Sequence, residues 1–182
     1  KITAEFLILF AITVLLNKII INNKNFFFKF IMILFLDTVS SLPEFSLIKD
    51  NKIIYSEKIL LNLNDKMSDM LIPSFIKLQK KYKLESKLHL LLINTGPGSY
   101  TALRIGIAFF SGLSLSQNIN LTGISCPDLL RFAIPEEELQ YSVIYISSSN
   151  DQNFIGFYNI YKKNFEIKKI EDNNPFDMQG FD

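Results

Sequence analysis

The stretch Leu90-Leu-Leu-Ile-Asn94, followed by Thr95-Gly-Pro-Gly-Ser-Tyr-Thr-Ala-Leu-Arg-Ile-Gly106, decides the fold of this chain. Its first part is an apolar run too short for a helix, and it ends at a turn in which two glycines flank a proline. A long apolar segment with hydroxyl residues at its start follows directly. The stretch therefore predicts a strand, a tight loop and a helix over about 101–117, capped by Ser99 or Thr101.

The predicted loop has features that suit an anion. Gly96 and Gly98 can adopt backbone angles closed to other residues, and the N–H groups at the start of a helix lie at the positive end of its dipole. The loop follows neither the phosphate-loop pattern nor the dinucleotide pattern, and many Gly-Pro-Gly loops only turn the chain. Two interpretations stay open from these residues: an anion or nucleotide site that includes Gly96, Gly98, Ser99 and Thr101, or a structural turn.

Composition excludes several classes of protein. The chain has 182 residues, of which 48% are hydrophobic and 17 are phenylalanine, so it can bury a sizeable core. A net charge of +1 argues against a strong nucleic-acid surface of its own. One cysteine and one histidine cannot fill a tetrahedral zinc site, and a single cysteine fits a reducing compartment such as the cytoplasm.

Residues 1–31 differ in character from the rest. The apolar run from Phe6 to Leu16 is broken by Asn17-Lys18, whereas a membrane span needs about 20 predominantly apolar residues. We expect residues 1–31 to be a non-native upstream extension or an apolar N-terminal segment with no role in the fold. A membrane anchor is the alternative.

The other predicted elements follow the same reading of apolar runs and turn residues. Strands are expected at 33–36, 45–48, 53–60, 121–125, 143–146, 154–161 and 165–170, and helices at 66–82 and 127–133. Asp65 is the expected cap of the first helix. Asp37-Thr38 ends the first strand at the mouth of the fold, where it could meet a phosphate or a metal, or could simply cap the next turn.

The two long predicted helices carry more apolar surface than one sheet can cover. The helix over 101–117 is apolar nearly all round, and the helix over 66–82 has a wide apolar stripe. Such a pair is either fully internal or forms an interface with a partner, and we favour the interface. Its expected contact residues are Met67, Met70, Leu71, Ser74, Ala108, Phe109 and Gly112.

One motif carries a family resemblance. Gly96-Pro-Gly-Ser-Tyr-Thr-Ala-Leu-Arg-Ile-Gly106 closely resembles the signature Gly-Pro-Gly-Ser-Phe-Thr-Gly-Leu-Arg-Ile-Gly of the bacterial TsaB (YeaZ-like) family. The resemblance implies an α/β fold, ribonuclease H-like and of the actin/Hsp70 (ASKHA) superfamily, with a mixed sheet and flanking helices. It also implies an N-terminal lobe at 32–134 and a short or reduced C-terminal lobe at 135–182. Asp37 resembles the first phosphate-loop Asp of that superfamily.

The chain departs from the family pattern at positions that matter for chemistry. Met67 stands where TsaB-like sequences commonly carry His, Cys126 stands in place of a Thr, and Ser147 stands where an Asp is common. The catalytic relative TsaD binds metal through two His on the corresponding helix, and neither is present here. We therefore expect no catalytic residues and no metal site.

The function that the resemblance implies is that of a non-catalytic scaffold subunit. TsaB-like proteins pair with a TsaD-like catalytic subunit and a TsaE-like ATPase in a cytoplasmic complex that makes N6-threonylcarbamoyladenosine at position 37 of tRNAs. The chain would contact tRNA only through that complex, form a homodimer when its partner is absent, and need no cofactor of its own, ATP acting at the level of the complex. The alternative is an actin-like nucleotide-binding ATPase or a metallopeptidase-like enzyme.

Overall fold

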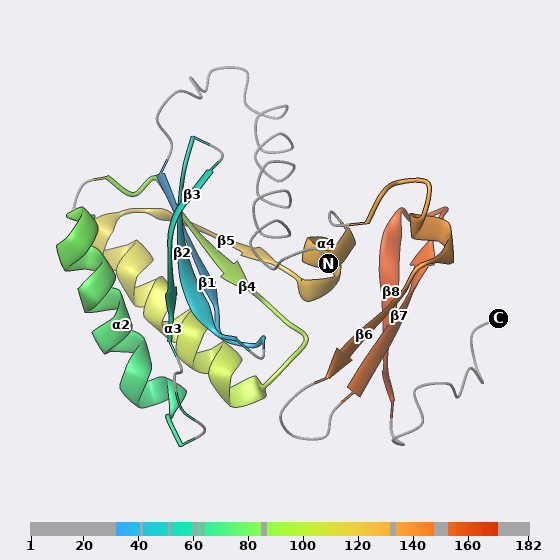
Figure 1. The fold of residues 1–182 in the computed structure, drawn as a ribbon, viewed down its shortest axis with the longest axis horizontal. Helices are drawn as coiled ribbons and strands as arrows, with labels where there is room; N and C mark the ends of the chain where they lie inside the picture. Colours follow the sequence, from blue (N-terminus) through green and yellow to red (C-terminus); the bar gives the residue numbers. More distant parts are fainter. Residues whose placement is uncertain are drawn as a thin grey trace.

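The computed structural model describes residues 32–40, 42–50, 52–59, 62, 64–84, 87–131, 134–147 and 153–170. The expected extension at residues 1–31 and the end of the chain at 171–182 lie outside the described residues, so the expectations about them and about the lobe boundaries stay predictions. The described residues form two sheets, each with helices packed beside it (Figure 1). In chain order the elements are β1 (Met32–Asp37), β2 (Glu44–Lys49), β3 (Lys52–Lys58), α2 (Met67–Tyr82), β4 (Leu90–Asn94), α3 (Tyr100–Gln117), β5 (Asn120–Ile124), α4 (Cys126–Arg131), the 3-10 turn η2 (Leu139–Tyr141), β6 (Val143–Ser147), β7 (Asn153–Asn159) and β8 (Asn164–Ile170).

The first sheet is mixed, as expected. Its five strands lie in the order β3-β2-β1-β4-β5, with antiparallel pairs from β1 to β3 and parallel pairs from β1 to β5. The connection from β4 to β5 is α3, a crossover helix of the kind that parallel strands require. The predicted fold class, a mixed sheet with flanking helices, is confirmed.

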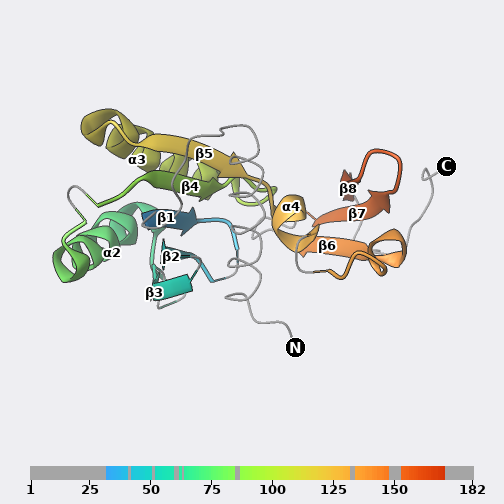
Figure 2. The same ribbon diagram turned by 90° about the horizontal axis from the view of Figure 1, so that it is seen from above.

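The two faces of this sheet have separate cores. In β1, Leu34 and Leu36 lie in the cluster that α2 and α3 cover, while Ile33 and Phe35 point to the opposite face, because side chains alternate along a strand. The ring of Phe45 lies 5.9 Å from that of Phe75 on α2 and contacts α3 as well. Both long helices therefore cover the same face, which Figure 2 shows from above.

The start of α2 differs from the expectation. Its N-cap is Lys66, which makes no side-chain cap hydrogen bond. The carboxylate of Asp65 instead accepts a hydrogen bond from the backbone N–H of Asn62 at 2.9 Å. The expected Asp65 cap is therefore wrong, because the preceding turn uses that oxygen. Among the described helices, none is long and apolar enough to cross a membrane.

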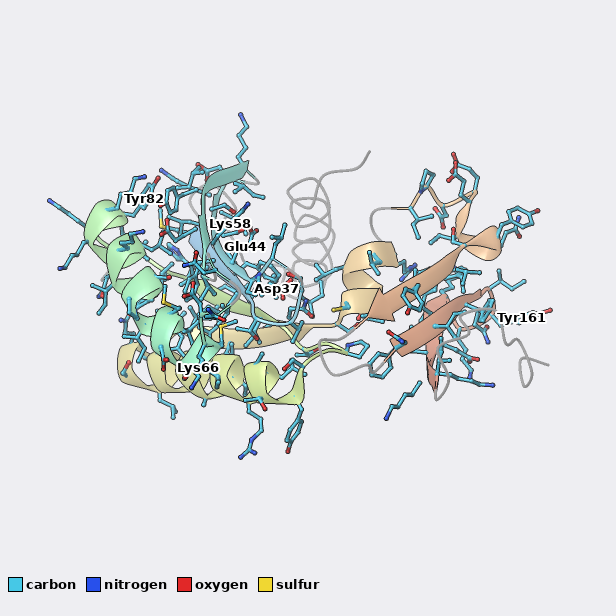
Figure 3. All side chains as sticks on the ribbon, turned by 60° about the horizontal axis from the view of Figure 1, so that its bottom comes forward. Asp37, Glu44, Lys58, Lys66, Tyr82 and Tyr161 are labelled. Atoms are coloured by element: carbon cyan, nitrogen blue, oxygen red, sulfur yellow. The ribbon has the colours of Figure 1, made fainter. Side chains whose placement is uncertain are left out.

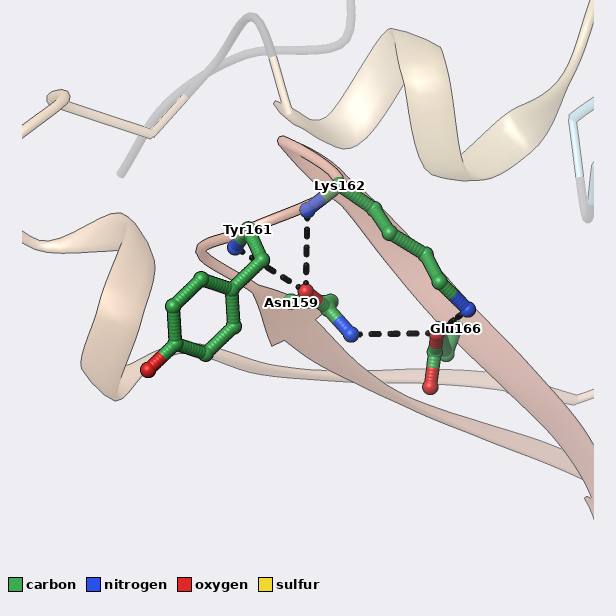
Figure 4. A network of polar contacts seen from close by, with 4 residues as sticks. All are labelled: Asn159, Tyr161, Lys162 and Glu166. Carbon is green, nitrogen blue, oxygen red and sulfur yellow. Dashed lines mark hydrogen bonds and ion pairs between the residues drawn. The ribbon is translucent and has the colours of Figure 1, made fainter.

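The second sheet is a meander in the order β6-β7-β8, with α4 and η2 against it. Its core is formed by Leu139, Ile144 and Phe165. At the β7–β8 hairpin, the side-chain oxygen of Asn159 accepts hydrogen bonds from the backbone N–H groups of Tyr161 and Lys162 at 3.0 and 2.9 Å (Figure 4). The side-chain N–H of Asn159 donates to Glu166, which also forms an ion pair with Lys162. Asn159 therefore binds both the backbone of the turn and a side chain of β8.

Candidate functional site

The turn after β1 and the start of α3 lie directly against each other. A Cβ atom added at Gly98 would sit 2.7 Å from Cβ of Val39, and one added at Gly106 would sit 2.8 Å from Cγ2 of Thr38. Real Cβ atoms do not approach so closely, so both glycines are needed for this contact. The fold thus brings two expected site segments together, the Asp37-Thr38 turn and the Gly96–Thr101 loop, at the carboxyl ends of β1 and β4.

Asp37 has a structural task in this arrangement. Its Oδ1 accepts hydrogen bonds from the backbone N–H groups of Val39 at 2.8 Å and Ser40 at 3.0 Å, and its side chain is buried. It pairs in register with Glu44, so the two side chains belong to the same face of the sheet, and both residues are labelled in Figure 3. These bonds support the interpretation of Asp37 as the cap of the turn. The hydroxyl Oγ1 of Thr38 is buried without a hydrogen-bond partner.

The loop after β4 is held by two residues that the sequence did not single out as functional. Oδ1 of Asn94 accepts hydrogen bonds from the backbone N–H of Gly96 at 2.9 Å and from Sγ of Cys126 at 3.2 Å. The backbone N–H of Cys126 donates to the carbonyl of Gly96 at 2.7 Å. Gly96 has φ of 87°, a conformation that glycine adopts at little cost, and its peptide bond to Pro97 is cis. An asparagine that ends an apolar strand just before a glycine turn is the signal that could have identified this clamp.

Cys126 is a poor nucleophile here. Burial raises the pKa of its thiol to about 11, the hydrogen bond to Asn94 opposes that rise, and the charge of Asp37 adds to it. The thiol is therefore protonated at neutral pH, which makes it unreactive.

The two hydroxyl residues of the loop, Ser99 and Thr101, have different surroundings. Ser99 is the N-cap of α3, and its hydroxyl accepts from the backbone N–H of Ala102 at 3.5 Å. Thr101 is exposed on the first turn of the helix. Ser99 therefore serves the helix start, as expected, and an anion site at this loop stays a prediction.

The expected partner surface is only partly exposed. Met67, Leu71 and Ser74 are buried, Met70 and Phe109 are half-buried, and Ala108 and Gly112 are exposed. The large apolar residues on α2 that reach solvent are Ile72 and Ile76, with exposed fractions of 52% and 41%. The stripe on α2 is wide enough to bury one side on the sheet and leave the other side exposed. Leu115 on α3 is 85% exposed.

Comparison with known proteins identifies the family of this chain. Residues 63–172, more than half of it, match the model of the family described as "TsaD: tRNA N6-adenosine threonylcarbamoyltransferase". The chain belongs to the TsaD family. The matched residues include the Gly96 to Gly106 motif, on which the resemblance noted from the sequence rests.

The TsaD-family chain also has the fold of solved YeaZ structures. YeaZ from Pseudomonas aeruginosa aligns with a TM-score of 0.56 at 18% identity, over 81% of this chain and 72% of that one. A structure titled as an uncharacterized protein with similarity to peptidase YeaZ from Pseudomonas aeruginosa aligns with a TM-score of 0.58 at 18% identity, over 82% and 72%. These matches confirm the expected TsaB (YeaZ-like) resemblance and fold class. No curated protein matches the chain.

Within the part of the TsaD-family chain that the structure describes, no group of three or more His, Cys, Asp or Glu residues could hold a metal ion. His89 is exposed, and its Nδ1 accepts a hydrogen bond from the backbone N–H of Met32 at 3.2 Å. The histidine thus helps to tie the start of β1 to the segment before β4.

Proposed function

We propose that the chain is a non-catalytic scaffold subunit of the machinery that makes N6-threonylcarbamoyladenosine at position 37 of tRNAs. It would pair through α2 and α3 with a TsaD-like catalytic subunit, in a complex that also includes a TsaE-like ATPase. Membership of the TsaD family supports a role in this tRNA modification. The apolar surface on α2 and α3 supports the proposed pairing with another subunit.

Gly112 carries this proposal. It lies inside α3, it is exposed, and a Cβ atom added there would meet nothing within 4 Å. A glycine in a helix interior costs about 1 kcal/mol relative to alanine, and nothing in the described fold uses its missing side chain. A glycine at such a position is explained when a second backbone approaches the helix closely, as small residues allow at helix–helix contacts.

The residues around Gly112 are suited to contact a partner. Ala108 and Gly112 are four residues apart and Leu115 follows three later, so all three share one side of α3. Ile72 and Ile76 share one side of α2 in the same way, and α2 contacts α3 where the rings of Phe75 and Phe109 lie 5.1 Å apart. We call the residues Ile72, Ile76, Ala108, Gly112 and Leu115 the apolar helix surface. It replaces Met67, Leu71 and Ser74 of the expected contact set, since the chain's own core covers those three.

The other parts of the proposal follow from this surface. Without its partner, the chain would cover the apolar helix surface by forming a symmetric homodimer. It would reach tRNA only through the complex, carry no cofactor of its own, and act in the cytoplasm, with ATP used at the level of the complex.

Co-purification of the full chain with the TsaD-like protein of the same organism tests the proposal. We expect a stoichiometric complex with the native chain, loss of that complex with Ile72→Glu or Ala108→Glu, and its retention with Ile160→Glu. Ile160 is the matched control because it is as exposed as Ile72, at 52%, but lies at the β7–β8 turn. A complex that survives both helix variants, or no complex at all, contradicts the proposal.

An actin-like nucleotide-binding ATPase is the second candidate. The observation in its favour is that the Asp37-Thr38 turn and the Gly96–Thr101 loop meet at the carboxyl ends of parallel strands, where ligands bind in open α/β sheets. ATP hydrolysis by the purified chain, abolished by Asp37→Asn, would favour this function over the scaffold. Hydrolysis that Asp37→Asn leaves unchanged, or none, counts against it.

A further inference from the structure

Many of the lysines of this chain gather where α2 ends. Residues 49–58 and 77–87 together hold eight lysines and three acidic residues, a net charge of +5. Because the whole chain carries +1, all the other residues together carry −4. The near-neutral total therefore hides a strong separation of charge, and a basic cluster of this kind attracts polyanions.

The fold joins these two segments at one end of the first sheet. The rings of Tyr55 on β3 and Tyr82 on α2 lie 5.1 Å apart, and Nζ of Lys81 lies 4.0 Å from the centre of the Tyr55 ring. Lys49 pairs in register with Lys52 at the β2–β3 turn, and Figure 1 shows that turn at the same end of the sheet as the end of α2. We call the following five residues the basic patch: Lys49, Lys52, Lys80, Lys81 and Lys83.

The charge of the basic patch is not compensated by the acidic residues around it. Lys77 forms an ion pair with Glu57 at 2.8 Å, but within the part of the chain that the structure describes none of the five patch lysines forms one. All of them except the half-buried Lys49 are exposed.

Helix electrostatics explain only part of this cluster. The dipole of α2 favours cations in its last turn, which accounts for Lys80 and Lys81. It does not account for Lys49 and Lys52 on the neighbouring hairpin, because like charges directly opposite each other on paired strands are destabilising. A bound polyanion would remove that repulsion.

We propose that the basic patch binds the phosphate backbone of tRNA directly. The inference rests on the proposed function for the identity of the polyanion, and it runs against the expectation that the chain reaches tRNA only through the complex. Lysine ammonium groups hold phosphates without reading bases, so they would position the tRNA while another subunit selects the adenosine.

The position of the basic patch fits this role. Ile72, Ile76 and Lys80 follow one another at intervals of four residues, so they share one side of α2. The patch is therefore continuous with the apolar helix surface, and a tRNA bound there would lie beside the catalytic subunit. An anionic membrane is the other polyanion that lysines attract, but the proposed pairing occupies the apolar residues that would have to enter it, so we favour RNA.

Binding of a fluorescently labelled tRNA to the full chain tests the proposal. Lys80→Gln with Lys83→Gln removes two charges from the basic patch. Lys163→Gln with Lys169→Gln is the matched control, because it removes the same charge from exposed lysines of the β7–β8 hairpin. We expect the first pair to weaken binding about tenfold and to lower the slope of log Kd against log salt concentration by about 2, one for each lost phosphate contact. The control pair should leave both quantities unchanged.

Three results would overturn the proposal. Equal weakening by the two lysine pairs would mean that overall charge, and not the basic patch, attracts the RNA. Absence of tRNA binding by the native chain would remove its basis. Vesicles of phosphatidylserine and phosphatidylcholine provide the third arm, since binding to vesicles without binding to tRNA would show that a membrane occupies the patch instead.

The result can be separated from the test of the proposed function. A chain that forms the complex with the TsaD-like subunit but does not bind tRNA contradicts this inference and leaves the proposed function standing. A chain that binds tRNA through the basic patch, as judged by the two lysine pairs, but forms no such complex contradicts only the proposed function.

Discussion

Thr38 occupies the space that a side chain at residue 106 would need. A Cβ atom at Gly106 would lie 2.8 Å from Cγ2 and 2.9 Å from Oγ1 of Thr38, so the turn after β1 can touch the first turns of α3 only because residue 106 is glycine. This contact joins the first strand to the helix that follows the Gly96–Pro97 turn. It also explains, without a ligand, why a glycine ends the motif.

Gly106→Ala is therefore expected to destabilise the fold. Thr38 is buried and Ile93 closes the other side at 3.3 Å, so the added methyl group has no space, and overpacking of this kind costs about 1–3 kcal/mol. Chemical denaturation should show the loss as a lower free energy of unfolding. An unchanged value would mean that the turn moves away from α3 at no cost.

Gly112→Ala should act in the opposite direction. Nothing lies within 4 Å of the added Cβ, so the free energy of unfolding should rise by about 0.5–1 kcal/mol, the gain from replacing a helical glycine. If the proposed interface is correct, binding to the TsaD-like subunit should weaken in the same variant, because the close approach is blocked. Calorimetric binding and unfolding of one protein sample check both effects, and equal binding by Gly112→Ala and the native chain would contradict the role given to this glycine.

Asp37→Ala should destabilise the chain more than Asp37→Asn. The alanine removes the oxygen that accepts from Val39 and Ser40, whereas asparagine keeps an acceptor oxygen in the same place. Two lost hydrogen bonds to a partly buried turn correspond to about 1–3 kcal/mol. Thermal unfolding of the two variants tests the difference, and equal losses would show that the negative charge matters rather than the turn.

We expect the Cys126 thiol to make the stability of the fold depend on pH in the alkaline range. Its pKa is about 11 in the folded chain against an ordinary 9.0, so the unfolded chain releases this proton first. The protonated thiol should therefore contribute its full stabilisation below pH 9. As the pH rises to about 11, the free energy of unfolding should fall by roughly 2–3 kcal/mol. Tyrosines titrate in the same range, so the measurement is the difference between the native chain and Cys126→Ala across that range. A difference that does not change with pH would contradict a buried, protonated thiol.

A polar cluster that joins Tyr55 and Glu57 of β3 to Lys77 of α2 gives a prediction at acid pH. Burial raises the pKa of Glu57, but hydrogen bonds from Lys77 and Tyr55 outweigh it and lower the pKa of this carboxyl. The same hydrogen bond from Tyr55 raises the pKa of that tyrosine to about 12. The stabilisation from Glu57 should thus be present at neutral pH and be lost as the pH falls through the lowered pKa.

The variant Lys77→Met with Tyr55→Phe should raise the pKa of Glu57 because both hydrogen bonds are gone and the burial remains. An NMR titration of the glutamate carboxyl measures this pKa directly. Lys80→Met is the control, since Lys80 lies on the same helix, is exposed, and is not among the groups that shift this carboxyl.

Much of this protein could be predicted from local sequence patterns. Apolar runs, turn residues and helical spacing identified the strands and helices in order, because those patterns depend on neighbours a few residues away. The string Gly96 to Gly106 also identified the loop, its Ser99 cap and the family resemblance.

Only the tertiary structure decided which surface each of those residues occupies. The side of α2 that contains Met67 and Leu71 is buried while Ile72 and Ile76 are exposed, because α2 and α3 share one face of the sheet. The hydrogen bonds of Asp37 depend on how its own turn is folded. Two other contacts join segments that are far apart in the chain: Thr38 lies against Gly106, and Asn94 accepts a hydrogen bond from Cys126. Strand order sets those distances, and strand order depends on long-range packing that no local window of sequence contains.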